Sequence, residues 1–250
     1  MNSVLSIILL VLLILITGKR GIKTFLTIYF NLALIFIIVI LVGWGFNPLI
    51  PTFVICLIIS VLILFFLNGF NKKTISSFIS VSLILIIFTF ITLLLTNNIY
   101  IQGYTEERIE AIGYVTYDTG INMLTLSNCI IIIGLIGNIV DSSIAISSAL
   151  YEIHLNNPKL SKKELFISGM NIGRDILGTT TNTLFFAYLG AHMTLLIFFQ
   201  DHEYSISAIL NAKVFAQEFT QIILSGMASF IIIPLTSLIS SNVYLFRKED

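Results

Sequence analysis

The stretch Ser168-Gly-Met-Asn-Ile-Gly-Arg-Asp-Ile-Leu-Gly-Thr-Thr-Thr-Asn-Thr183 decides how this chain must fold. It carries glycines and two adjacent charges, yet it lies between two long apolar runs. Charged residues make up 10% of the chain and hydrophobic residues 57%, and the mean hydropathy is +1.01. That is too little charge to cover the surface of a water-soluble domain. The sequence therefore predicts an all-α, polytopic bundle of transmembrane helices.

The apolar runs predict about seven membrane spans, with a glycine-broken or re-entrant helix before span six. The expected spans are residues 3–17, 25–45, 49–67, 75–96, 122–150, 179–199 and 215–240. With seven spans most lysines and arginines fall on one side, which puts the N-terminus outside and the C-terminus inside. We expect a four-span hydrophobic scaffold at 1–96, an extracytoplasmic loop at 97–120, and a core at 121–250 with spans five to seven. The first four spans have uncharged cores and are expected to face lipid.

Several classes of protein are disfavoured by what the chain lacks. A formal net charge of zero offers no basic face for a nucleic acid. Cys56 and Cys129 both lie inside apolar runs and are interpreted as packing residues. The three histidines have no ligand spacing, and no nucleotide-binding loop or nucleophile–base motif occurs. We expect no metal, no cofactor and no enzymatic activity.

Polar residues at helical spacing mark one face on each of three successive helices. Because lipid would leave such faces unsatisfied, we expect the three faces to meet. The stripes are Asn138, Asp141, Ser142, Ala145, Ser148 and Glu152; then Asn171, Asp175, Gly178 and Asn182; then Asn211, Glu218, Gln221, Ser225 and Ser229.

A helix is predicted to start at Ser161, where Ser161 and Glu164 form the S-x-x-E capping box. If unbroken to residue 199, this helix would be about 60 Å long, about twice the hydrocarbon thickness. Part of such a helix lies outside the membrane, or the helix breaks, and Gly169, Gly173 and Gly178 are the expected break points. Many transporters bind ions and substrates at broken helices of this kind. In the alternative interpretation, Gly169-x-x-x-Gly173 is a close-packing motif between helices.

The charges in and around this stretch form the candidate substrate or ion site. Arg174 and Asp175 point about 100° apart on a helix, so Arg174 is expected to pair with Asp141. The alternative is a structural ion pair that fixes spans five and six together. Glu218 is expected near the outer end of the seventh span. Its alternative roles are an outer gate residue, a partner of Lys213 or a surface carboxylate. The full candidate set is Asp141, Asn171, Arg174, Asp175, Asn182 and Glu218.

The core also resembles a known family. Its Asp141-to-Glu152 segment, the SGMNIGRD motif at 168–175, the Gly178-Thr179 pair and the Asn182-Thr-Leu184 triplet resemble the YibE/YibF family of bacterial membrane proteins, over roughly residues 125–245. The resemblance implies a multi-pass protein of the bacterial cytoplasmic membrane, of the shorter, YibF-like type. It implies a second family protein as partner, with a homo-oligomer as the alternative, and it implies no particular reaction.

Two functions from different classes follow from these patterns. The preferred one is a transporter or permease subunit for a small solute or ion, because charges and glycines lie beside polar helix faces. The alternative is a non-transporting subunit that holds together a membrane complex, with the glycines and the Asp141–Arg174 pair used for packing.

Overall fold

The structure, a computed structural model, describes residues 2–99 and 123–245, and this part of the chain is helical with no strand. The predicted all-α class is confirmed. Residues 100–120 of the predicted loop lie outside the described residues. The helices are α1 (Asn2–Thr17), α2 (Lys19–Gly43), α3 (Leu49–Val61) with the π-helical turn η1 (Leu62–Phe66), α4 (Lys72–Ile99), α6 (Met123–Asn156), α7 (Lys162–Ala191), α8 (Met193–Asp201), α9 (Ile206–Asn211) and α10 (Lys213–Leu245).

Within the described residues, five helices are long and apolar enough to cross a membrane: α2, α3 with η1, α4, α6 and α10. The pair α7 and α8 makes a sixth candidate, bent by 51° at its break. The remaining predicted span is α1, which has 16 residues and packs against α2. At about 1.5 Å per residue, α1 is shorter than a bilayer core of roughly 30 Å. The count of seven spans therefore stays a prediction.

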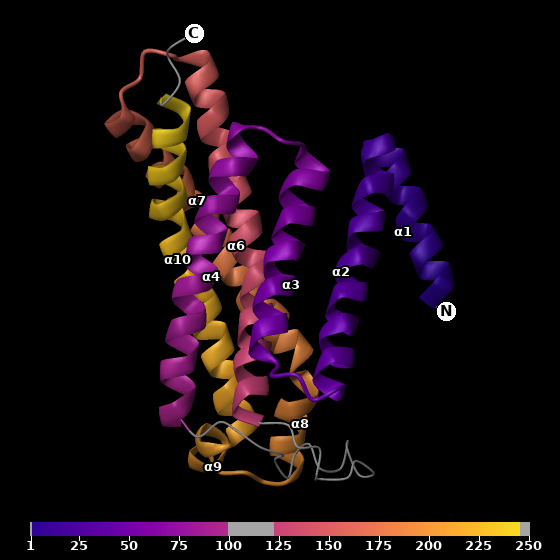
Figure 1. The fold of residues 1–250 in the computed structure, drawn as a ribbon. Coiled ribbons are helices and arrows are strands. Elements are labelled where there is room, and N and C mark those ends of the chain that lie inside the picture. The colour runs from indigo at the N-terminus through magenta and orange to yellow at the C-terminus, as the bar shows by residue number, and fades with distance from the viewer. Residues whose placement is uncertain (1, 100–122, 246–250) are drawn as a thin grey trace.

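The basic turns of the chain gather at one end of the bundle. Figure 1 shows the α1–α2, α3–α4 and α6–α7 connections at the same end, with α8 and α9 at the other. Arg20 in the first turn donates a hydrogen bond of 2.7 Å to Oδ1 of Asn68 in the second. This distribution agrees with the predicted orientation, which itself stays a prediction.

The core of the bundle is built by α4, α6 and α10, with α3 against α6 and α7 against α10 (Figure 1). Side chains such as Ile84, Leu85, Ile139 and Ile232 are fully buried there. The expectation that the first four spans face lipid is therefore wrong for α4 and for the face of α3 that packs on α6. Buried serines, Ser76, Ser77 and Ser80, let α4 pack closely on its neighbours. The absence of charge in a helix does not tell whether it lies in the bundle core or faces lipid.

The predicted start of α7 is confirmed in detail. Ser161 caps the helix, and the backbone N–H of Glu164 donates to Oγ of Ser161 at 3.3 Å. The Glu164 carboxylate accepts from the backbone N–H of Ser161 at 2.7 Å. Both bonds satisfy N–H groups that a helix terminus otherwise leaves without partners.

The prediction that α7 breaks at its glycines is wrong, because the helix is continuous from Lys162 to Ala191. The break lies at His192, where α7 ends and α8 begins. A Cβ added at Gly173 would lie 2.2 Å from Cγ2 of Ile233, and one at Gly169 would lie 2.5 Å from Oγ of Ser237. These two glycines serve close packing of α7 on α10, which was the alternative interpretation.

Candidate functional site

A groove opens between α6 and α7, with a volume of about 540 Å³. Its α6 wall consists of residues four apart and their neighbours, which share one helix face. Its α7 wall is built in the same way. The groove is lined by Gly137, Asn138, Asp141, Ser142 and Ala145 of α6 and by Ile176, Thr179, Thr180, Thr183 and Leu184 of α7.

Asp141 is the charged residue of this lining, and its side chain is exposed. The threonine hydroxyls beside it act as acceptors. Thr179 donates its proton to the carbonyl of Ile176 at 3.0 Å, and Thr183 donates to the carbonyl of Thr179 at 2.9 Å. With the donors used inside the helix, each oxygen offers lone pairs for a further bond. A carboxylate among hydroxyl acceptors suits a cation or a ligand that donates hydrogen bonds.

Asn138 closes the groove toward α10. Its Nδ2 atom donates to the carbonyl of Ser225 at 3.3 Å and also to Oγ of Ser229. Both amide protons are thereby used on α10, and Oδ1 is the remaining polar atom of this side chain. The predicted meeting of the fifth-span and seventh-span stripes is therefore confirmed at this level of the bundle.

The contact between α6 and α10 continues as hydroxyl pairs toward the end with the basic turns. Oγ of Ser143 lies 3.1 Å from Oγ1 of Thr236, and Oγ of Ser147 lies 2.6 Å from the hydroxyl of Tyr244. The α4 helix joins this cluster through Ser76, whose Oγ lies 2.7 Å from that of Ser147. Sequence reasoning missed α4 here, although Ser76, Ser77 and Ser80 lie on one helix face and signal a polar contact.

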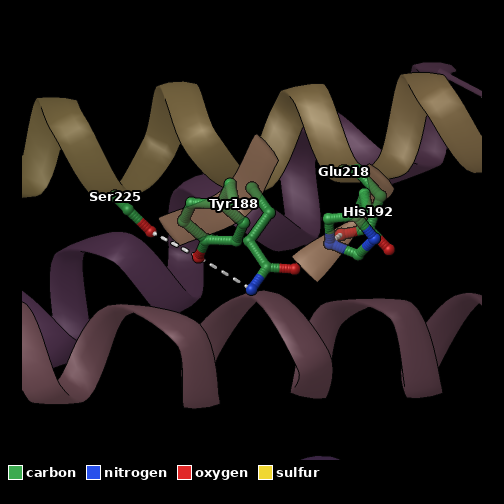
Figure 2. Close-up of polar contacts among 5 residues, drawn as sticks. Tyr188, His192, Glu218 and Ser225 are labelled. Carbon is green, nitrogen blue, oxygen red and sulfur yellow. Dashed lines mark hydrogen bonds and ion pairs between the residues drawn. The ribbon is translucent and has the colours of Figure 1, made fainter. Parts of the chain in front are cut away.

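Glu218 pairs with His192 at the break between α7 and α8, with 2.9 Å between Oε2 and Nε2. Next to this pair, Nε2 of Gln221 donates to the hydroxyl of Tyr188 at 2.9 Å. That hydroxyl also lies 3.4 Å from Oγ of Ser225, and Figure 2 shows Tyr188 between Ser225 and the His192–Glu218 pair. The sequence interpretation left His192 without a role.

The Glu218 pair and the Asp141 groove are separate sites. Glu218 does not line the groove, and its partner His192 follows Leu184, the last groove residue of α7, by 8 residues. At 1.5 Å per residue, the two sites are roughly 12 Å apart along α7. Glu218 therefore does not reach the Asp141 region, a question that the sequence left open.

The polar stripe of α7 does not turn toward the other two stripes, so that prediction is wrong. Asn171, Arg174, Asp175, Gly178 and Asn182 are all exposed. The opposite face of α7, with Gly169 and Gly173, packs on α10. Within residues 2–99 and 123–245 the structure has no ion pair between Asp141 and Arg174. Of the predicted site residues, Asp141 alone lines the groove.

A comparison with known protein families finds that the model of the YibE/F-like protein family matches residues 5–245. The chain belongs to the YibE/F-like family. The match runs from α1 to the end of α10, so it includes the first four helices, over which the sequence motifs carried no resemblance. No curated protein and no solved structure is similar enough to count as a match.

Family membership and the apolar helices together make this YibE/F-like protein a multi-pass integral membrane protein. Among its described residues, no group of three or more His, Cys, Asp and Glu side chains lies together as a metal site would need. Cys56 and Cys129 are buried, free thiols, as their position in apolar runs predicted.

Proposed function

We propose that this YibE/F-like protein is a transporter or permease subunit, and that it binds a cationic or hydrogen-bond-donating solute at Asp141. The observation that carries the proposal is the groove between α6 and α7, in which one carboxylate lies among hydroxyl acceptors. An ionisable residue inside a transmembrane segment is costly, and such residues commonly mark ion or substrate pathways.

The position of Asp141 along its helix supports this role. It lies 15 residues before the end of α6 at Asn156 and 18 residues after the start at Met123. At about 1.5 Å per residue it is more than 20 Å from either end, near the middle of α6. Transporters place substrate and ion sites near the middle of their spanning helices, where access can alternate between the two sides.

Reconstitution into liposomes tests the proposal. Wild-type protein is compared with Asp141→Asn, which keeps the shape of the side chain and removes its charge, over a panel of H⁺, Na⁺, K⁺, Mg²⁺ and small organic ammonium ions. The matched control is Glu152→Gln, an exposed carboxylate at the end of the same helix and outside the groove. We expect saturable flux of one cation in wild type and control, and loss of that flux in Asp141→Asn. Equal flux in all three proteins, or none in any, contradicts the proposal.

The alternative function is a non-transporting subunit of a membrane complex, and the exposed polar face of α7 favours it. In that case Asp141→Asn would leave the activity of the complex unchanged, whereas substitutions on the α7 face would dissociate the complex.

We further propose that the protein lies in the bacterial cytoplasmic membrane, works without a cofactor and catalyses no reaction of its own.

A further inference from the structure

The outward face of α7 is too polar to lie against lipid. Asn171, Arg174, Asp175 and Asn182 are all exposed on it, at spacings that keep them on one side of the helix. Arg174 follows Lys162 by 12 residues and precedes Asp201 by 27, which places it roughly 18 Å along the helix from the end with the basic turns. Charged residues at such depth face a protein interior or water, since hydrocarbon cannot solvate them.

The described part of the chain does not cover this face. Within the described residues, α7 packs through its other side on α10 and α6, and Arg174 has no carboxylate partner. Gly178 lies in the middle of the polar stripe, and a Cβ added there would meet nothing within 4 Å. Its lack of a side chain therefore serves no contact inside the described fold, in contrast to Gly169 and Gly173.

We propose that a second copy of this chain covers the face, with α7 packed against α7 around a two-fold axis perpendicular to the membrane. A two-fold axis in this direction brings the same residues of both copies to the same depth. Arg174 of each copy is then at the level of Asp175 of the other, and two reciprocal ion pairs form. The four charges sum to zero, which is what burial in a membrane interior requires.

The uncharged residues of the outward α7 face are also self-complementary across the two-fold axis. Asn171 and Asn182 each meet their own counterpart, and a carboxamide both donates and accepts, so two of them can pair across the axis. Gly178 lies between them and allows the two helix backbones to approach closely. A partner with an unrelated sequence would need a complementary set of charges and amides, whereas a second copy supplies that set by symmetry. This inference does not rest on the proposed transport function.

Disulfide cross-linking in native membranes tests the contact directly. In a background with Cys56→Ala and Cys129→Ala, single cysteines replace Asn171, Gly178 or Asn182. The matched controls are Phe90→Cys on α4 and Phe230→Cys on α10, whose side chains are 62% and 55% exposed. Oxidation is expected to give a band of twice the monomer mass for the α7 variants and not for the controls. The proposal is overturned if every variant stays monomeric, if only the control variants form dimers, or if the α7 variants cross-link to another protein.

Charge reversal tests the ion pairs in the chain with its native cysteines. Copies with two different affinity tags are co-expressed, and the amount of one that co-purifies with the other is measured. Arg174→Asp or Asp175→Arg alone places four like charges together and is expected to lower co-purification at least about tenfold. The double variant restores two reciprocal pairs and is expected to return to the wild-type level. Unchanged single variants, or a double variant that stays monomeric, overturn the proposal. Asp141→Asn is expected to leave both readouts unchanged, which separates this test from that of the groove.

Discussion

Replacing Gly173 by alanine is expected to destabilise the bundle, because the new methyl group has no room. The added Cβ would lie 2.2 Å from Cγ2 of Ile233, whose side chain is only 2% exposed. A β-branched side chain packed in a core cannot easily rotate away. Overpacking of this kind typically costs about 1–3 kcal/mol. Alanine recovers about 0.5–1 kcal/mol through its better helix propensity. Because Ile233 has little room to move, we take the middle to upper part of the overpacking range and expect a net loss of about 1–2 kcal/mol.

The two buried cysteines provide the assay. Cys56 and Cys129 are 0% and 2% exposed, so a thiol-reactive fluorogenic dye reports the opening of the bundle on heating. A net loss of about 1–2 kcal/mol corresponds to a drop of about 2–8 °C in the unfolding midpoint for a protein of this size. The control is Gly190→Ala on the same helix, where a Cβ meets nothing within 4 Å and the midpoint should stay or rise slightly.

A second substitution tests whether Ile233 is the cause. Ile233→Ala alone is expected to destabilise by about 2–5 kcal/mol through the cavity that it leaves. Combined with Gly173→Ala, the two changes compensate in volume, and the double variant should be more stable than the sum of the single effects by about 0.5–3 kcal/mol. Additive effects, or a Gly173→Ala variant as stable as Gly190→Ala, would refute close packing at Gly173.

Two further predictions concern the polar contacts of α10. Ser147→Ala is expected to cost about 0.5–1.5 kcal/mol in the same thermal assay, because it removes the hydroxyl that lies 2.6 Å from the Tyr244 hydroxyl and 2.7 Å from Oγ of Ser76, while Tyr244 keeps its 2.8 Å bond to the backbone carbonyl of Ser147. Ser148→Ala, one residue further, should have a much smaller effect, and equal effects would contradict the assignment. In a double-mutant cycle of His192→Ala and Glu218→Gln, the two changes should be non-additive by about 0.5–3 kcal/mol because the side chains are 2.9 Å apart. Additive effects in that cycle would show that His192 and Glu218 do not interact.

Hydropathy and capping predicted the features that depend on local sequence. The start of α7 follows from Ser161 and Glu164 alone, since a capping box uses only neighbouring residues. The contact of α6 with α10 also followed from periodicity, because polar residues at helical spacing on both helices had to find partners away from lipid. The family resemblance pointed to the same part of the chain.

The orientation of α7 could not be predicted, because this helix has two special faces. One carries Gly169 and Gly173, the other carries Arg174 and Asp175, and periodicity does not say which one turns inward. The structure packs the glycine face on α10 and leaves the charged face exposed. That arrangement depends on the shape of Ile233 and Ser237 on α10, which are distant in sequence. The same limit hid the role of α4, whose serines find partners only in the folded bundle.

The most direct test of the Asp141 groove is the reactivity of a cysteine placed in it at Thr183. In membranes, Thr183→Cys is treated with a cationic and with an anionic methanethiosulfonate reagent, while the buried Cys56 and Cys129 stay protected. A water-filled groove with a carboxylate should favour the cationic reagent by about tenfold, and Asp141→Asn should abolish the preference. A cysteine that reacts with neither reagent, or with both equally in the presence of Asp141, would contradict a cation site in this groove.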